Sequence, residues 1–307
     1  MNPIALCREN GFAEAFILPV APYEDWTRHR NGGAFHSNAD ELKDNPADAY
    51  PWANACMIAV WAYAPYDDTS VVAAYYPASN AAYHAMTRIV RMLNEAGIQA
   101  ERAKTPFRTQ LLTAGIGTKM DNQLWYYPPY GTYTHLEGVM LKLNEPVAFT
   151  PPHANEPVCD HCGRCDKVCY GALNGGRYDW HDCIRSYLET VPIPARFLPE
   201  LTCFFGCQRC QDVCPKNPKS FVPVPDGVRA ALDPVRILNG ELPKALQVLG
   251  TNRKKQILRQ AIVLCANHRR TDALPTLLRM REAGDSPYKS ELDYAIFLLQ
   301  KEKSMVK

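Results

Sequence analysis

The strongest constraint on this chain is a pair of short-spaced cysteine runs between residues 159 and 214. The first reads C-x2-C-x2-C-x3-C over residues 159–169, and the second reads C-x2-C-x3-C-P over residues 207–215. The first spacing is typical of bacterial proteins with two iron–sulfur clusters, in which the fourth cysteine of a run ligates the other cluster. The pattern therefore predicts two 4Fe–4S clusters.

The spacing also predicts how the ligands divide between the clusters. Three thiolates of one run surround one face of a cluster, and a remote cysteine completes the set. The first predicted quartet is Cys159, Cys162, Cys165 and Cys214. The second is Cys169, Cys207, Cys210 and one further cysteine. Phe204 stands where the second run lacks its first cysteine, so spacing alone leaves both Cys183 and Cys203 open as the eighth ligand.

Two other uses of cysteine fit less well. Zinc is also held by C-x2-C pairs, but structural zinc sites use four ligands rather than eight in this rhythm. Structural disulfides are expected in oxidising compartments, and the first seven residues are too short for a secretory signal segment. We therefore expect a cytoplasmic protein with reduced thiols. Cys7, Cys56 and Cys265 have apolar neighbours and are predicted to be buried small hydrophobic residues.

Length and charge narrow the remaining choices. The 307 residues suffice for two or three domains, and no run of 18 apolar residues predicts a membrane helix. The net charge is +2, which argues against a strongly basic nucleic-acid binder. From residue 241 onward, however, 13 Lys or Arg stand against 7 Asp or Glu. This surplus of six predicts either a surface that follows a phosphate backbone or solvated helices.

Hydrophobic periodicity and the positions of prolines and glycines divide the chain into three predicted parts. Residues 1–150 are predicted as an α/β unit, with strands at 12–20, 56–64, 122–127 and 132–143, and with a helix at 79–96 capped by Ser79. A turn is expected at residues 128–131. Residues 145–158 hold four prolines and are predicted as a linker before a cluster domain, within boundaries of 151–225. Residues 226–307 are predicted to be helical, with helices at 254–266, 273–283 and 291–300.

Several segments together resemble the epoxyqueuosine reductases, which are cobalamin and iron–sulfur enzymes related to the reductive dehalogenases. Residues 114–117 read A-G-I-G, residue 122 is Asn and residues 128–131 read P-P-Y-G, aligning without a gap to the family's A-G-L-G, G-K-N and P-x-Y-G. Residues 181–188 resemble the family segment with an arginine-cysteine-isoleucine-serine-tyrosine-leucine core, which favours Cys183 as the eighth ligand. The second cysteine run and Asn217 also match.

The resemblance implies an α+β architecture and a function. It implies a nitroreductase-like N-terminal domain, a ferredoxin-like double-cluster domain and a short HEAT-like helical region. The implied activity is an oxidoreductase of queuosine biosynthesis, in which two clusters transfer electrons to cobalamin and a queuosine-precursor tRNA is the substrate. Ferredoxin or flavodoxin is the implied electron donor. The residues expected to bind cobalamin are His84, Gly115, Gly117, Asn122, Tyr130 and Gly131. The aromatic residues at 125–127, 130 and 133 are expected to line its pocket or to form strand core.

The chain departs from the family where catalysis is expected. The family's catalytic aspartate lies three residues before a proline, and counting back from Pro106 places Ala103 there. The family's G-K-N lysine is Asp121. Replacement proton donors are predicted among Glu101, Lys104, Tyr130 and His135. Two alternative functions remain open at this point. One is a cobalamin-dependent reductase of a different small substrate or of a corrinoid partner, and the other is a ferredoxin-like electron carrier without cobalamin.

Overall fold

The computed structural model describes residues 1–21, 46–149, 158–189, 192–284 and 286–305. The chain forms two compact units, each assembled from segments that are distant in the sequence. Unit 1 comprises Met1–Ala64, Ala78–Asp182 and Arg209–Ser220, and unit 2 comprises Pro65–Pro77, Cys183–Gln208 and Phe221–Lys307. The mixed α and β content agrees with the predicted fold class. The predicted division into three domains stays a prediction.

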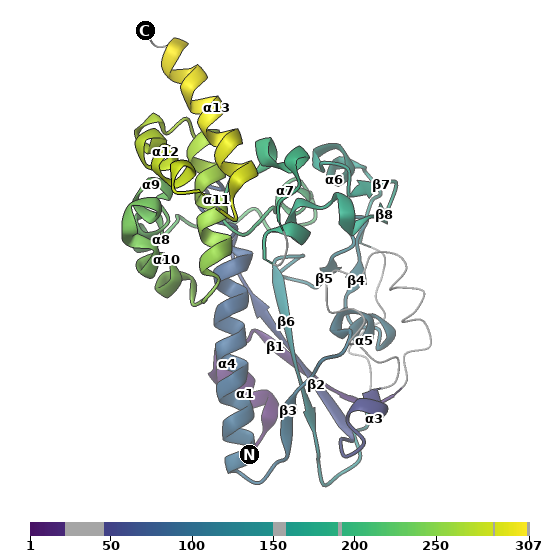
Figure 1. Cartoon of the computed structure of the whole chain (residues 1–307). Helices are drawn as coiled ribbons and strands as arrows, with labels where there is room; N and C mark the ends of the chain where they lie inside the picture. Colours follow the sequence, from purple (N-terminus) through teal and green to yellow (C-terminus); the bar gives the residue numbers. More distant parts are fainter. Residues whose placement is uncertain (22–45, 150–157, 190–191, 285, 306–307) are drawn as a thin grey trace. The chain divides into compact units, whose positions relative to one another are not determined.

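Unit 1 is built on a four-stranded antiparallel sheet (Figure 1). Its order is β1 (Glu14–Pro19), β2 (Ala55–Ala62), β6 (Thr134–Leu141) and β3 (Ala100–Arg102). The first six residues of β2 are all buried, because helices cover both faces of the sheet and a strand covered on both faces needs a continuous apolar run. The predicted strands at 12–20, 56–64 and 132–143 are confirmed, with bounds that differ by one or two residues.

The two faces of the sheet have separate cores. Helices α1 (Pro3–Glu9) and α4 (Tyr75–Glu95) cover one face, where Met57 and Val139 meet the apolar side of α4. Helix α5 (Phe107–Thr113) covers the other face (Figure 1). Trp125 belongs to the core on that side. The apolar side of α4 repeats at helical spacing and is fully buried, as Ala82, Ala85, Met86, Ile89 and Leu93.

The predicted start of the α4 helix was wrong. The helix begins at Tyr75, four residues before the predicted cap Ser79. Pro77 lies in its first turn, where a missing backbone N–H costs nothing because that group has no partner within the helix. The predicted end is confirmed, since Gly97 follows the helix with a φ of 81°.

The remaining elements of unit 1 are short. They are α3 (Pro46–Ala49), β4 (Thr118–Lys119), β5 (Trp125–Tyr126), α6 (Arg164–Val168), β7 (Leu173–Asn174), β8 (Arg177–Tyr178), a 3-10 turn at Trp180–Asp182 and α7 (Arg209–Asp212). The strand predicted at 122–127 is thus only the two residues of β5. The turn predicted at 128–131 is confirmed, since Tyr127 and Gly131 exchange backbone hydrogen bonds across it.

Unit 2 is mainly helical. Its elements are the 3-10 turns Ile184–Tyr187, Ala195–Glu200 and Thr271–Ala273, the π-helical turn Ile237–Glu241, and helices α8 (Asp226–Ala231), α9 (Pro234–Arg236), α10 (Leu242–Leu249), α11 (Lys254–Asn267), α12 (Leu274–Glu282) and α13 (Lys289–Met305). The three predicted C-terminal helices are confirmed as α11, α12 and α13, which share one core. Among the described residues, every helix is too short or too polar to cross a lipid bilayer.

Three of the cysteines outside the two runs are buried, as predicted. Cys7, Cys56 and Cys265 have no exposed surface. Burial raises the pKa of the Cys56 thiol to about 11 and that of the Cys7 and Cys265 thiols to about 12. These three side chains therefore stay protonated and pack as small apolar groups. Residues 150–157 of the predicted linker lie outside the described part of the chain.

Candidate functional site

The first cysteine run turns sharply between its thiols. Residues 158–163 form a loop that leads into α6, and both His161 and Gly163 have a left-handed backbone, with φ of 51° and 67°. Cys162 is exposed, and Cys159, Cys165 and Cys169 are half-buried. Two left-handed residues within three positions reverse the chain between successive cysteines, as a short-spaced run must do to surround one cluster. All twelve cysteines lie in the described residues, and none of them forms a disulfide.

The predicted ligands divide unequally between the units. All four residues of the first quartet, at 159, 162, 165 and 214, belong to unit 1. Of the second quartet, Cys169 and Cys210 belong to unit 1, and Cys183 and Cys207 belong to unit 2. Both quartets stay predictions, and the donor chemistry of unit 1 fits a thiolate-bound cluster.

A buried network of side-chain amides joins the second cysteine run to Thr132 and Tyr133, the two residues before β6. Asn217 Oδ1 accepts from the Thr132 backbone N–H at 2.9 Å, and Asn217 Nδ2 donates to Thr132 Oγ1 and to the Gln211 carbonyl, both at 2.8 Å. Gln211 Nε2 in turn donates to the Thr132 carbonyl at 2.7 Å. Tyr133 donates to Asp212 Oδ1 at 3.0 Å. Burial and, next, the Asp212 carboxylate raise the pKa of Tyr133, so its hydroxyl stays protonated.

At two of the glycines predicted to contact cobalamin, local packing within the protein already requires glycine. A Cβ on Gly131, which has a φ of 64°, would lie 2.4 Å from Asn217 Oδ1. A Cβ on Gly117 would lie 2.3 Å from Trp125 Nε1, which donates to the Ile116 carbonyl at 2.7 Å. These positions therefore need glycine for the protein's own contacts. Their role toward a cofactor, and that of Gly115, stays a prediction.

The aromatic residues near the turn have different roles. Trp125 and Tyr133 are 4% and 1% exposed and belong to the core, as one of the two interpretations of the sequence held. Trp125 stacks on Tyr127 with ring centroids 5.2 Å apart. The residues at 126, 127 and 130 are half-buried, so only these three have surface to offer a ligand.

The structure does not bring the predicted proton donors together. Glu101 is exposed on β3 opposite Met140, a residue of the core on the α5 face. His135 shares the opposite face with Val139, because side chains alternate along a strand. Lys104 is exposed after β3, and Tyr130 lies in the turn before β6. Ala103 packs against the α5-face core, with its N–H bonded to the Gly138 carbonyl at 2.8 Å.

His135 instead belongs to a network that sequence reasoning missed. Glu137, 6% exposed, accepts from Arg102 Nη2 at 2.5 Å, and its other oxygen lies 3.1 Å from His135 Nε2. Arg102 also donates to the Tyr83 carbonyl at 2.9 Å and lies 4.0 Å from the Tyr83 ring centroid. The only signal in the sequence was an acid within the apolar residues 136–141 of β6. His84, predicted to bind cobalamin, is exposed on α4 beside this network, with its ring 5.5 Å from that of Tyr83.

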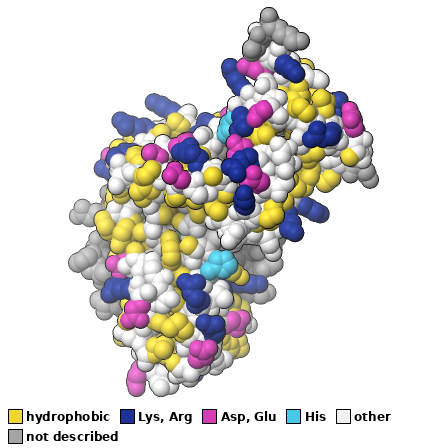
Figure 2. Space-filling view, turned by 90° about the vertical axis from the view of Figure 1, so that its left-hand side faces the viewer, with side chains coloured by type: hydrophobic (Ala, Val, Ile, Leu, Met, Phe, Trp, Pro, Cys, Tyr) yellow, Lys and Arg dark blue, Asp and Glu magenta, His cyan; other side chains and the backbone are white. Residues whose placement is uncertain are grey.

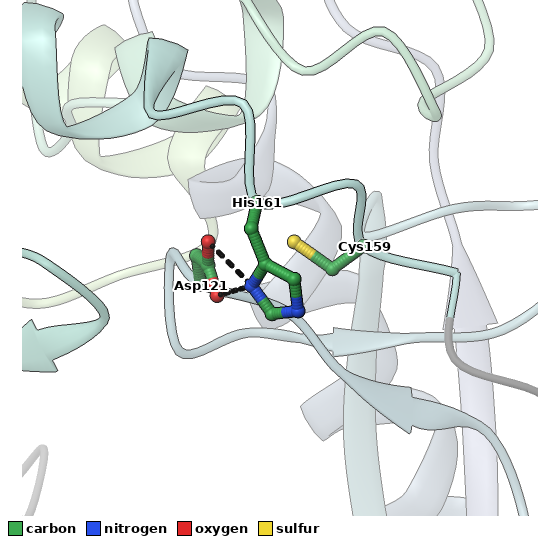
Figure 3. A group of neighbouring side chains, drawn as sticks. All are labelled: Asp121, Cys159 and His161. Carbon is green, nitrogen blue, oxygen red and sulfur yellow. Dashed lines mark hydrogen bonds and ion pairs between the residues drawn. The ribbon is translucent and has the colours of Figure 1, made fainter.

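A second unpredicted group joins the first cysteine run to the β4–β5 hairpin. His161 Nδ1 lies 2.9 and 3.1 Å from the two carboxylate oxygens of Asp121 (Figure 3). Their ligand atoms and Cys159 Sγ all lie within 4.8 Å of one another. The sequence showed Asp121 only as a departure from the family's lysine.

No protein-family model matches the chain. Curated relatives do match part of it. The epoxyqueuosine reductase of Bacillus subtilis is 31% identical over 221 residues, which are 62% of this chain and 55% of that protein. The enzyme of Bacillus anthracis is 30% identical over 188 residues, which are 57% of this chain and 48% of that protein. The chain thus spans about half the length of the curated relatives it matches.

Solved structures match over nearly the whole chain. A structure of epoxyqueuosine reductase from Bacillus subtilis, with its aspartate catalytic loop swung out of the active site, gives a TM-score of 0.76 at 20% identity and covers 99% of this chain and 93% of that one. An epoxyqueuosine reductase with an epoxyqueuosine-modified tRNA stem loop gives a TM-score of 0.75, also at 20% identity, with the same shares of both chains covered. The likeness at this identity shows a common fold, and the resemblance seen in the sequence is confirmed.

The amide network predicts that Asn217→Ala destabilises unit 1. The substitution leaves the Thr132 N–H and the Gln211 carbonyl buried without this partner, so we expect the free energy of unfolding to fall by about 2–4 kcal/mol. Urea denaturation followed by circular dichroism measures it. Asn144→Ala, at an exposed position, is the matched control and is expected to change stability by less than about 0.5 kcal/mol. Equal stability of the two variants would contradict the role assigned to the network.

Proposed function

Because this chain is similar to the epoxyqueuosine reductases over about half their length and shares their fold, we propose that it is an oxidoreductase of this type. Its two 4Fe–4S clusters transfer electrons for the reductive removal of an epoxide oxygen from a queuosine-precursor tRNA. The proposal divides the chain into three domains. They are a nitroreductase-like domain at 1–150, a ferredoxin-like domain at 151–225 and a HEAT-like region at 226–307. The protein acts in the cytoplasm and takes electrons from a ferredoxin or flavodoxin.

One observation carries this proposal more than any other. Residues of three motifs that resemble the family contact one another within unit 1: Asn122, the P-P-Y-G turn, and the second cysteine run from residue 209 onward. The residues at 131 and 132 of the turn contact Asn217 of the second cysteine run, and Asn122 donates to the Cys210 carbonyl at 3.3 Å. These motifs resemble the family separately and also contact one another. This supports one functional site rather than several chance similarities.

The proposed cofactors differ in how well the described residues fit them. The cysteine framework and the left-handed residues at 161 and 163 fit a cluster. Six residues were predicted to bind cobalamin, and three of them already have contacts within the protein. These are Gly117 and Gly131, through their packing, and Asn122, through its hydrogen bonds. His84, Gly115 and Tyr130 are the other residues proposed to hold it. When bound, cobalamin supplies a reduced metal centre, and the protein supplies position and electrostatics.

His135 is the proton donor that the structure supports best. Removal of an epoxide oxygen consumes two electrons and two protons and releases water, so the site needs an acid. Glu137 holds the imidazole at a half-buried position on β6 and is itself paired with Arg102, while Glu101 and Lys104 are exposed. Tyr130 is the second candidate, because it is half-buried in the turn.

The test of function is turnover of epoxyqueuosine tRNA by the protein reconstituted anaerobically with iron, sulfide and cobalamin. We expect queuosine formation in the wild type and a loss of about 10²-fold or more in kcat for His135→Ala, the usual contribution of a general acid. Glu101→Gln is the matched control and is expected to stay near wild type. Cob(II)alamin bound with a changed EPR signal but no queuosine would favour another substrate, and an unchanged free-cobalamin signal would contradict a corrinoid enzyme.

A second candidate function rests on Ala103. The acid that the family carries at this position is missing, which favours a cobalamin-dependent reductase whose substrate is a different small molecule or a corrinoid partner. The Ala103 methyl group is half-buried and packs against the α5-face core. A ferredoxin-like electron carrier without cobalamin is the third candidate, and the cobalamin EPR measurement separates it from the other two.

The identity of the eighth cluster ligand gives a second prediction. Cys203 is 4% exposed and donates to the Gly206 carbonyl at 3.5 Å, whereas Cys183 is half-buried at the start of a 3-10 turn. We expect Cys183→Ala to lose about half of the iron and sulfide after reconstitution, because one of two clusters loses a ligand. Cys203→Ala is the control and keeps both clusters. Equal iron loss in both variants would refute the assignment.

The charges of unit 2 predict how it binds tRNA. Lys and Arg side chains of the helical unit are interspersed with acids (Figure 2). Several are paired, as Lys244 is with Glu241 at 2.9 Å. Lys254 and Lys255 are exposed at the start of α11. If they contact phosphates, changing both to Gln lowers the slope of log affinity against log salt by about 1.4–1.8, that is 0.7–0.9 per contact.

Filter binding of tRNA at several salt concentrations measures this slope. Lys244→Gln is the matched control, because its charge is paired within its own helix region and its removal is expected to leave the slope unchanged. An affinity for tRNA that does not fall with salt would contradict phosphate binding altogether.

A further inference from the structure

We propose that Asp121, oriented by His161, places a negative charge beside Cys159 and thereby lowers the reduction potential of the cluster bound by the first quartet. This inference rests on the proposed function, since it requires that cluster. It concerns a residue at which the chain departs from the family, and it assigns that departure a consequence for electron transfer rather than for the substrate.

The geometry brings a carboxylate next to a ligand sulfur. A carboxylate oxygen of Asp121 and an imidazole nitrogen of His161 both lie within 4.8 Å of Cys159 Sγ. His161 Nδ1 lies 2.9 and 3.1 Å from the two oxygens of Asp121, so the ring holds both of them toward the cysteine loop (Figure 3). The Asp121 side chain is 22% exposed, so solvent only partly screens its charge.

The carboxylate cannot easily turn away, because its backbone is held on both sides. Asp121 lies in the β4–β5 hairpin, where the Met120 N–H donates to the Leu124 carbonyl at 3.1 Å. Gln123 is buried with a φ of 63°, and its Nε2 donates to the carbonyls of Asp121 at 3.1 Å and Gly176 at 2.6 Å. Asn122, also buried, donates to the Cys210 carbonyl.

The electrostatic consequence has a definite sign. A reduced cluster carries one more electron than an oxidised one, so a nearby anion destabilises the reduced form more and lowers the potential. Two other carboxylates belong to the first run. Asp160 pairs with Lys216 at 2.9 Å. Asp166 Oδ2 accepts from the Gly175 N–H at 2.8 Å and its Oδ1 lies 3.7 Å from Cys165 Sγ, so Asp166 is a second anion beside the first quartet, and its charge is the same in every Asp121 variant. The lysine that the family carries at the position of Asp121 would have the opposite effect.

The same three side chains could also hold a single metal ion. A carboxylate, an imidazole and a thiolate are a donor set that zinc accepts. The two arrangements exclude each other, because Cys159 cannot complete a cluster and a separate metal site at once. Loss of bound metal on changing Asp121 would therefore identify Asp121 as a ligand and overturn the inference.

The experiment compares variants of the reconstituted full-length protein by iron and sulfide analysis and by EPR-monitored redox titration. Asp121→Asn removes the charge at nearly constant shape, Asp121→Lys reverses it, and Asp121→Glu retains it. For Asp121→Asn we expect unchanged iron and sulfide content. We also expect the ratio of reduced to oxidised cluster at a fixed potential to rise about tenfold, which corresponds to a rise of about 59 mV in the midpoint potential of a one-electron couple. Asp121→Lys should shift one midpoint further in the same direction, and Asp121→Glu should stay near wild type.

Asp179→Asn is the matched control. Asp179 also accepts from a histidine, with His181 Nδ1 at 2.9 Å, but no cysteine sulfur completes a metal-binding group with this pair among the described residues. We expect both midpoints to stay unchanged in this variant. Clusters that assemble in Asp121→Asn with unshifted midpoints would overturn the inference alone, whereas a wild-type protein that binds no cluster would overturn the proposed function as well.

Discussion

The hydrogen bonds of Asn217 are the interaction on which the arrangement of unit 1 depends. The second cysteine run begins at Cys207, 66 positions after the last residue of β6, and the buried amide of Asn217 joins it to Thr132, two residues before that strand. The same amide binds the Gln211 carbonyl, so it also shapes the cysteine run itself. Because a buried amide is costly to leave unpaired, this contact has one geometry and few alternatives. Gly131 is required beside it, since any Cβ there would displace the amide oxygen.

The β4–β5 hairpin extends this arrangement to the first cysteine run. Three successive residues at its tip each point to a different partner: Asp121 to His161, Asn122 to Cys210 and Gln123 to Gly176. A short polar tip thus contacts both cysteine runs and the loop between β7 and β8. A carboxylate oxygen of Asp121 at this tip lies within 4.8 Å of Cys159 Sγ, so a charge change here acts on that sulfur at short range, while a charge change on an exposed helix is largely screened by water and salt.

The site shows where sequence reasoning was strong and where it was weak. The P-P-Y-G turn and the three C-terminal helices could be predicted because they depend on local spacing, while the two cluster quartets stay predictions. The glycines were assigned to a corrin because glycine permits close approach, and the structure shows that at Gly117 and Gly131 the close neighbours are Trp125 and Asn217. The proton donors were assigned from residue type alone. Residue type does not reveal that Glu101 and His135 face opposite sides of the sheet.

The sequence by itself determined the cysteine spacing that predicts two clusters, three strands of the sheet, the three C-terminal helices and the resemblance to the epoxyqueuosine reductases. Each of these depends on spacing or periodicity along a continuous stretch of chain. Only the tertiary structure decided which distant residues meet: Asn217 with Thr132, Glu137 with Arg102, and Asp121 with His161 and Cys159. It also divided the chain into two units whose segments interleave in the sequence. The physical reason is that burial and pairing of polar groups depend on how strands and loops pack, and one sequence alone does not specify partners that lie 35 to 85 positions apart.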